Sequence, residues 1–322
     1  MDDVNTTADA RRASSPSRPP ASNAVLGRRA RSLAAETVVR WLVYLSGWMA
    51  ILILGAIMVF LASNAVQAMR VNGLWAMLRG DSWFPTGTPT SFGFLPSIVG
   101  SVWITLVAVG AAVPLGLASA VFISEFASGR IKEIAKSIIE FMAAIPSVVL
   151  GMIGIYLGVP FIKNTLGLSS GLTALTAGLF VGFMALPTIV SISEDALHAV
   201  PGSLRFGSLA LGNNRWQTSY KVVIPAASSG IFAAVMLGVG RAIGETMVVL
   251  MLAGNSGLIT KTPLESVRSL PGTIANEMGE VVQGGLHYST LFAMGLVLFA
   301  ITFVINLAAD VVLERQRVRW RR

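Results

Sequence analysis

The sequence predicts an all-α, polytopic membrane protein with six transmembrane helices. Of its 322 residues, 54% are hydrophobic and only 12% are charged, and the mean hydropathy is +0.70. A soluble globular domain carries roughly 25% charged residues, so this composition excludes one. Six apolar runs are long enough to cross about 30 Å of hydrocarbon at about 1.5 Å per residue. They cover residues 41–62, 98–125, 134–159, 172–192, 226–253 and 288–312.

Both ends of the chain differ from the apolar middle. Residues 1–40 are rich in Ser, Ala, Pro and Arg without apolar periodicity, which predicts a disordered tail. The run 41–62 is too long for the core of a cleavable signal peptide, so we expect it to remain as a membrane anchor. We therefore divide the chain into the tail 1–40, a six-helix membrane domain at 41–313 and a basic tail at 314–322.

The positions of the basic residues predict the orientation. Most of the 24 Lys and Arg residues lie in the two tails and in the short loops near 130–136 and 205–221. Short cytoplasmic loops retain positive charge, so both termini are expected in the cytoplasm, which requires an even number of spans. The net charge of +8 is explained by contact with lipid headgroups, and we expect no binding of nucleic acid.

Several classes of chemistry are excluded by what the sequence lacks. It contains no Cys and only two His residues, His198 and His287, so we expect no metal site. No Gly-rich loop ending in Gly-Lys-Ser/Thr is present to bind nucleotide phosphates. The chain is therefore expected to have no enzyme activity and no cofactor of its own.

Arg241 is the main candidate for a functional residue. It lies within the apolar run 226–253, about fifteen residues or 22 Å from its start, with Glu245 four positions later. A charge in the bilayer costs about 2.5 to 3.5 kcal/mol on insertion scales, so Arg241 should face the protein interior and have a partner. The planar guanidinium suits phosphate oxygens. Two interpretations stay open: Arg241 lines a transport path, or it forms an ion pair with Glu245 that only stabilises the bundle.

Three further polar residues could belong to the same path. Glu140, in the run 134–159, either pairs with Arg241 or is uncharged because burial disfavours its charged form. Ser147 and Thr246 could offer hydroxyl donors, although hydroxyls in membrane helices usually bond to their own backbone. One arginine with two ionised glutamates would repel an anion, so a second subunit is expected to supply cations.

Prolines and glycines within the spans predict a bundle with broken helices and close backbone contacts. Pro114, Pro146 and Pro187 each remove a backbone donor inside an apolar run. Glycines four residues apart let neighbouring helices approach closely. These pairs are Gly154 with Gly158, Gly178 with Gly182, and Gly240 with Gly244.

The polar stretch at 198–225 predicts two short helices on the cytoplasmic face. Residues 203–211 and 215–223 are separated by Gly212-Asn-Asn, and Pro225 stands before the fifth span. The aromatic and aliphatic side chains of this stretch could dock a soluble partner. The alternative is an amphipathic connector that rests on lipid.

This stretch resembles the cytoplasmic loop of permeases in binding-protein-dependent ABC importers. Phe206, Gly207, Ser208 and Gly212, followed by Val-Val-Ile-Pro ending at Pro225, reproduce its spacing, although Phe206 stands where the family has glutamate. The resemblance implies the type I ABC importer permease fold. It also implies that a coupling helix at about 203–221 contacts an ATPase subunit.

The segment 240–247 (Gly-Arg-Ala-Ile-Gly-Glu-Thr-Met) resembles the signature of phosphate-specific importer permeases. Met247, the segment 274–280 and His287 are closest to the PstC type. The resemblance implies an ATP-driven phosphate importer in the bacterial cytoplasmic membrane. Its other components would be a PstA-type permease subunit, two PstB-type ATPase subunits that bind ATP and magnesium, and a PstS-type phosphate-binding protein.

Three other functions remain as alternatives. The chain could be a permease for another oxyanion, sulfate or molybdate, or a secondary transporter or channel that works without an ATPase. A purely structural membrane anchor would leave Arg241 and Glu245 without a role.

Overall fold

The computed structural model describes the backbone of residues 23–319 and the side chains of residues 36–314. The chain divides into two units, 1–57 and 58–322. In the first unit, the described residues 23–57 belong to helix α1 (Asn23–Asn72). Residues 1–22 of the predicted tail lie outside the described part. The prediction that 23–40 is disordered is wrong: helix α1 begins at Asn23, in a stretch that contains four alanines and Leu33, which favour helix.

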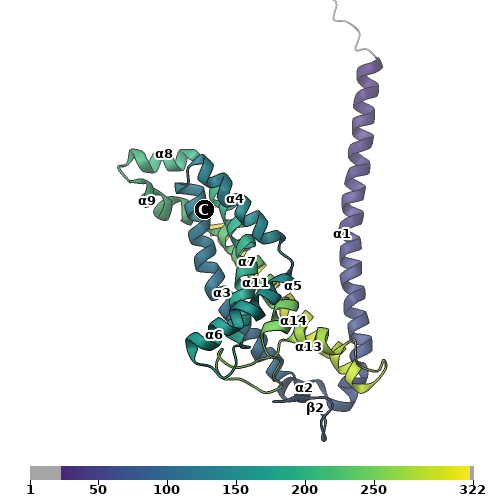
Figure 1. Cartoon of the computed structure of the whole chain (residues 1–322). Helices are drawn as coiled ribbons and strands as arrows, with labels where there is room; N and C mark the ends of the chain where they lie inside the picture. The colour runs from purple at the N-terminus through teal and green to yellow at the C-terminus, as the bar shows by residue number, and fades with distance from the viewer. Residues whose placement is uncertain (1–22, 320–322) are drawn as a thin grey trace, which may run out of the picture. The chain divides into compact units, whose positions relative to one another are not determined.

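The second unit is a helical bundle built around α3 (Leu95–Val121) and α7 (Ala174–His198), which share the most extensive contact (Figure 1). Two of the Gly-xxx-Gly pairs, Gly154 with Gly158 and Gly178 with Gly182, make close contacts. A Cβ at Gly178 would overlap the Val107 side chain, and a Cβ at Gly182 would meet the backbone of Ala108. Glycine is therefore what lets α7 lie directly against α3.

Three further helices pack around this pair. They are α11 (Ser228–Ile243) and the short α12 (Met247–Leu252), which both contact α7, and α14 (Leu286–Arg319), which packs against α11. Pro114 and Pro187 lie inside α3 and α7, which both continue through them, so the prediction that these prolines break the helices is wrong. Neighbouring helices in a bundle can absorb the lost backbone donor.

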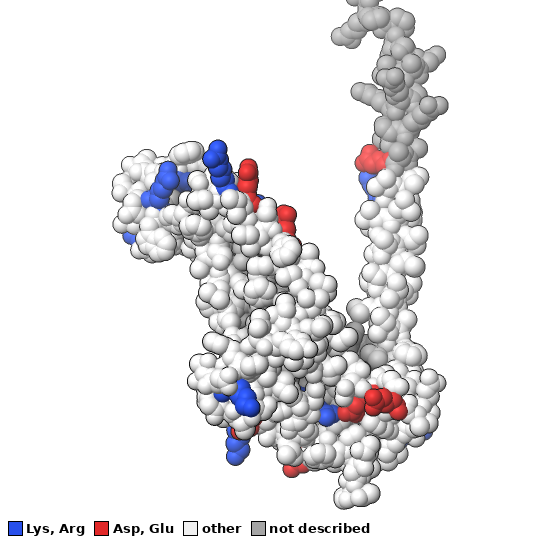
Figure 2. Space-filling view, viewed as in Figure 1, with Lys and Arg blue, Asp and Glu red and all other residues white. Residues whose placement is uncertain are grey.

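The described helices include five that are long and apolar enough to cross a membrane, and six if a bent pair counts as one span. The five are 36–72, 95–126, 147–166, 174–198 and 286–314. The bent pair joins 215–226 to α11 at 71°. In the second unit, the face drawn in Figure 2 carries its charged side chains near two ends, with an uncharged surface between them. The predicted polytopic membrane fold is confirmed.

The third predicted span is placed wrongly. Residues 134–159 do not form one helix, because α4 (Gly129–Ala144) ends at Ile145 and Pro146 adopts an extended conformation. The membrane-length segment instead runs through α5 (Ser147–Ile153), the π-helical turn η2 (Gly154–Gly158) and α6 (Val159–Leu166). Pro146 explains the break, because proline disfavours helix at the residue before it, here Ile145.

The fifth predicted span, 226–253, is also interrupted. Helix α11 ends at Ile243, the chain is not helical at 245–246, and α12 begins at Met247. Gly244 is the C-cap of α11. This interruption lies directly after Arg241 and changes the geometry expected for Glu245.

The ends of the bundle carry different short elements (Figure 1). At one end, which we call the α8 end, lie α8 (Gly202–Ala210), α9 (Arg215–Thr218), the π-helical turn η3 (Ser219–Val223) and α10 (Ile224–Ala226). At the other, the hairpin end, lie α2 (Leu74–Arg79), the antiparallel strands β1 (Trp83–Phe84) and β2 (Ser91–Phe92), and α13 (Leu270–Glu277). The π-helical turn η1 (Phe122–Phe126) extends α3 towards the α8 end.

Candidate functional site

Arg241 lies in the last turn of α11 and is partly buried. Its Nη1 donates a hydrogen bond to the hydroxyl of Thr188 on α7 at 3.1 Å. It forms no ion pair with any carboxylate of the residues that the structure describes. The guanidinium therefore keeps most of its donors for another partner.

The predicted ion pair between Arg241 and Glu245 is absent for a structural reason. The i,i+4 contact needs a continuous helix, whereas α11 ends at Ile243. Glu245 is buried, and its carboxylate accepts the backbone N–H of Val248 at 3.2 Å in the first turn of α12. An acidic group at this position stabilises the start of that helix.

The other predicted path residues form no hydrogen bond or ion pair with Arg241 in the described part of the chain. Thr246 donates its hydroxyl to the carbonyl of Gly244 at 3.3 Å, which is the backbone bonding expected of such hydroxyls. Glu140 is exposed on α4, and Ser147 is the first residue of α5. The described chain alone therefore joins Arg241 to Thr188, a residue that sequence reasoning missed, and not to Glu140 or Ser147.

The α8 end presents an apolar surface. Phe206, Leu209, Leu211, Trp216 and Tyr220 are all exposed on α8, α9 and the adjoining turns. We call these five residues the α8–α9 surface. Their exposure at a polar end of the bundle indicates a docking surface.

The remaining residues of the predicted coupling motif shape this segment. Gly212 has φ +87°, a conformation that favours glycine, and makes the turn between α8 and α9. Ser208 is buried, and its hydroxyl shares a hydrogen bond of 2.9 Å with that of Thr218. Gly207 is exposed, and Pro225 lies in α10. The motif thus builds a compact helix–turn–helix.

Two charged clusters fasten the α8 end. Arg205 on α8 forms an ion pair with Glu125 in η1 at 2.9 Å. Lys132 and Lys136 on α4 both contact the buried carboxylate of Glu194 on α7, each at 2.8 Å. The side-chain hydrogen bond with Glu194 raises the pKa of Lys136, so this lysine stays charged at physiological pH.

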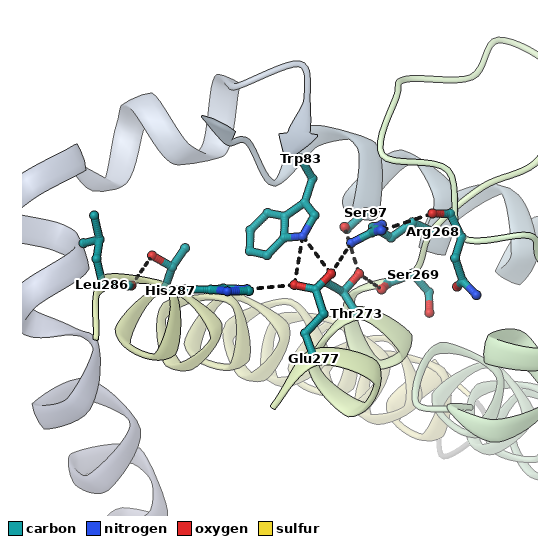
Figure 3. A network of polar contacts seen from close by, with 10 residues as sticks. Trp83, Ser97, Arg268, Ser269, Thr273, Glu277, Leu286 and His287 are labelled. Carbon is teal, nitrogen blue, oxygen red and sulfur yellow. Dashed lines mark hydrogen bonds and ion pairs between the residues drawn. The ribbon is translucent and has the colours of Figure 1, made fainter. Parts of the chain in front are cut away.

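The hairpin end is held by a polar network centred on Glu277 (Figure 3). Its carboxylate accepts hydrogen bonds from Trp83 Nε1 at 3.0 and 3.1 Å and from Arg268 Nη1 at 2.6 Å. His287 Nε2 lies 2.8 Å from the other oxygen. Arg268 also donates to the backbone carbonyl of Asn255 at 3.1 Å. One carboxylate therefore joins Trp83 to residues of the segment 268–287, which lies more than 180 positions later in the chain. Sequence reasoning missed this arrangement, although it singled out segment 274–280.

The same residues line a pocket of about 670 Å³ at the hairpin end. Arg268, Glu277 and His287 form part of its wall, together with Trp83 and Asn255. Arg241 is not one of the residues that line this pocket. Its polar groups are largely paired with one another, which indicates that the network is structural.

Replacing Glu277 by alanine is expected to lower the stability of the protein. Three donors would lose their common acceptor in a largely buried place, at a cost on the order of 3 kcal/mol. The measurement is the thermal denaturation midpoint in detergent. Glu280→Ala is the matched control, because Glu280 is exposed on the same surface and its side chain has no partner among the described residues. Equal midpoints for the two variants would contradict a stabilising role of the network.

The bundle, its interrupted fifth segment and the helix–turn–helix at the α8 end define an ABC importer permease. A family model described as the inner membrane component of binding-protein-dependent transport systems matches residues 112–318. The chain belongs to this family.

The relatives of this chain include a protein named as a probable ABC transporter permease and several named as phosphate permease PstC. The probable ABC transporter permease protein YqgH of Bacillus subtilis is 38% identical over 265 residues, covering 82% of this chain and 86% of the relative. The phosphate transport system permease protein PstC of Mesorhizobium japonicum is 34% identical, with the same coverage. PstC 1 of Mycobacterium tuberculosis is 30% identical over 90% of this chain and 96% of the relative.

Solved structures agree in fold. An inward-facing MetNI methionine ABC transporter matches with a TM-score of 0.56 at 18% identity, over 69% of this chain and 95% of its own. A bacterial alginate ABC transporter in complex with its alginate-bound periplasmic protein matches with a TM-score of 0.60 at 14% identity, over 87% and 96%. The predicted type I ABC importer permease fold is confirmed.

Proposed function

We propose that this chain is a permease subunit of an ATP-driven phosphate importer. The proposal is supported by the relatives that carry the name of phosphate permease PstC, at 30–34% identity over most of the chain. The observation that carries it is the state of Arg241, a guanidinium at the end of an apolar helix with no carboxylate partner among the described residues. Such a group has donors free for the oxygens of a tetrahedral anion.

The proposed transport path needs a second subunit. Arg241 uses one described donor on Thr188, and one guanidinium neutralises only part of the charge of phosphate. We expect a related PstA-type permease subunit to contribute further cations across a shared path. Glu245 is engaged at the start of α12, so its charge is partly offset by the helix N-terminus.

In the proposed complex, the α8 end faces the cytoplasm, as do both termini, and the hairpin end faces outward. Two PstB-type ATPase subunits bind ATP with magnesium and dock on the α8–α9 surface. A loaded PstS-type protein docks at the hairpin end. The bundle then exposes Arg241 to one side and afterwards to the other, and ATP and the loaded binding protein each stabilise a different state.

The decisive experiment is transport by the complete complex in proteoliposomes. We expect labelled phosphate to accumulate only when ATP and the binding protein are present. An excess of unlabelled phosphate should suppress uptake, whereas sulfate or molybdate should not. Suppression by sulfate or molybdate would favour the other oxyanion permeases, and uptake without ATP or an ATPase subunit would favour a secondary transporter.

A further inference from the structure

Helix α8 is joined to the rest of the bundle through the side chain of Arg205. Nη2 of this arginine donates to Glu125 Oε1 at 2.9 Å and to the backbone carbonyl of Leu197 at 2.8 Å. Nη1 donates to the backbone carbonyl of Val200. Among the described residues of α8, Arg205 is the only one whose side chain forms a hydrogen bond outside the segment 200–223. The Ser208 hydroxyl bonds only within that segment. The side-chain hydrogen bonds between α8 and the bundle are therefore concentrated at one guanidinium.

The partners of Arg205 are the ends of two long helices. Glu125 lies in η1, which continues α3, while Leu197 and Val200 lie at and just beyond the last turn of α7. The last carbonyls of a helix have no partner within it and carry partial negative charge. Arg205 brings a positive group to one such carbonyl, that of Leu197, and to the carbonyl of Val200 just beyond the helix. Its side chain is 24% exposed and that of Glu125 10%, so the pair is shielded from solvent more than an ordinary surface ion pair.

The segment that carries the α8–α9 surface is internally stiff. The hydrogen bond between the hydroxyls of Ser208 and Thr218 joins α8 to α9. Asn214 and Gln217 form a capping box at the start of α9. Behind them, Val223 is fully buried in a cluster that includes Leu197. A force on the exposed surface would therefore move the segment as one body and reach the bundle at Val223 and Arg205.

Helix α7 connects this point with the candidate path. Thr188, the partner of Arg241, precedes Leu197 by nine residues, or about 13 Å along the same helix. The helix is unbroken between them, and the paired lysines of α4 hold Glu194 on the intervening stretch. A contiguous chain of contacts thus runs from α8 through Arg205 and α7 to Thr188 and Arg241.

We propose that Arg205 is a positioning residue that transmits movement of the α8–α9 surface to α3 and α7, and so links ATP hydrolysis to the state of the Arg241 site. This inference rests on the proposed function. The test measures the coupling between ATP hydrolysis and transport directly. The quantity to measure is the number of ATP molecules hydrolysed per phosphate imported.

In the assembled complex, Arg205→Gln is expected to raise the ATP-to-phosphate ratio about tenfold, because the ion pair and the paired carbonyl contacts are lost together. Arg205→Lys should give an intermediate ratio, since a point charge cannot reach three acceptors in a fork. Glu125→Gln should raise the ratio less, because both carbonyl contacts remain. Arg130→Gln is the matched control: Arg130 is exposed in α4, and its side chain has no ion pair or hydrogen bond among the described residues.

A second measurement in the same complexes does not depend on the substrate. Amide hydrogen exchange of residues 202–210 should become faster in Arg205→Gln and remain unchanged in Arg130→Gln. An unchanged ATP-to-phosphate ratio in Arg205→Gln, with phosphate uptake by the unmodified complex, overturns the inference. If the unmodified complex imports no phosphate, the proposed function fails instead. Unchanged amide hydrogen exchange of residues 202–210 in Arg205→Gln would show that Arg205 does not fix α8, and it would also overturn the inference.

Discussion

Arg241→Gln is expected to abolish phosphate uptake while leaving the complex assembled. The substitution keeps a hydrogen-bonding amide for Thr188 but removes the charge and the forked donors that remain free in the structure. We expect uptake to fall at least about 100-fold, which corresponds to the loss of about 3 kcal/mol from charge-assisted contacts. The measurement is ATP-driven uptake of labelled phosphate in proteoliposomes.

Two companion variants make this result specific. Arg241→Lys keeps the charge but not the fork, so uptake should recover only in part. Thr246→Ala should leave uptake near normal, because the Thr246 hydroxyl is bonded to the Gly244 carbonyl. Copurification of the ATPase and of the second permease subunit checks assembly. Normal uptake by Arg241→Gln in an intact complex would remove this residue from the path.

The second large effect is expected for Gly100→Ala in α3. Gly100 is buried, and a Cβ at this position would overlap the backbone carbonyl of Arg268. Backbone cannot move aside as a flexible side chain can, so the substitution should push apart α3 and the loop that carries Arg268. We expect a loss of about 1 to 3 kcal/mol, seen as a lower denaturation midpoint and a lower yield of folded protein.

Gly110→Ala is the matched control on the same helix. A Cβ at Gly110 meets no atom within 4 Å. Alanine favours helix over glycine by about 1 kcal/mol, so this variant should be as stable as the unmodified protein or slightly more stable. If both glycine variants behaved alike, the close contact at Gly100 would not be a source of stability.

The composition and hydropathy of the chain were sufficient to predict its membrane fold. Long apolar runs impose helices in a bilayer, so most spans follow from local sequence. Local sequence was not sufficient to predict where the spans are interrupted. Pro146 within 134–159 and Gly244 within 226–253 were both visible, but hydropathy averages over a window and does not show where a helix ends.

The candidate site was predicted only in part, for a related reason. Arg241 is identified by its charge in an apolar run, which is a property of the sequence alone. Its partner Thr188 is 53 positions away, and Glu125 is 80 positions from Arg205. Such contacts depend on how α3, α7 and α11 pack. The expected Arg241–Glu245 pair failed because it assumed an unbroken helix.

The network around Glu277 also sets the stage of translation at which the hairpin end can fold. Trp83 and Glu277 are separated by 194 positions, and Ser289 contacts the backbone of Asn64 across 225. A ribosome must therefore translate nearly the whole chain before either contact can form. Until then, the indole of Trp83 and the segment around it lack their native partner. Closure of the hairpin end is consequently a late event in biogenesis, and a chain that stops before Glu277 would expose this segment to membrane quality control.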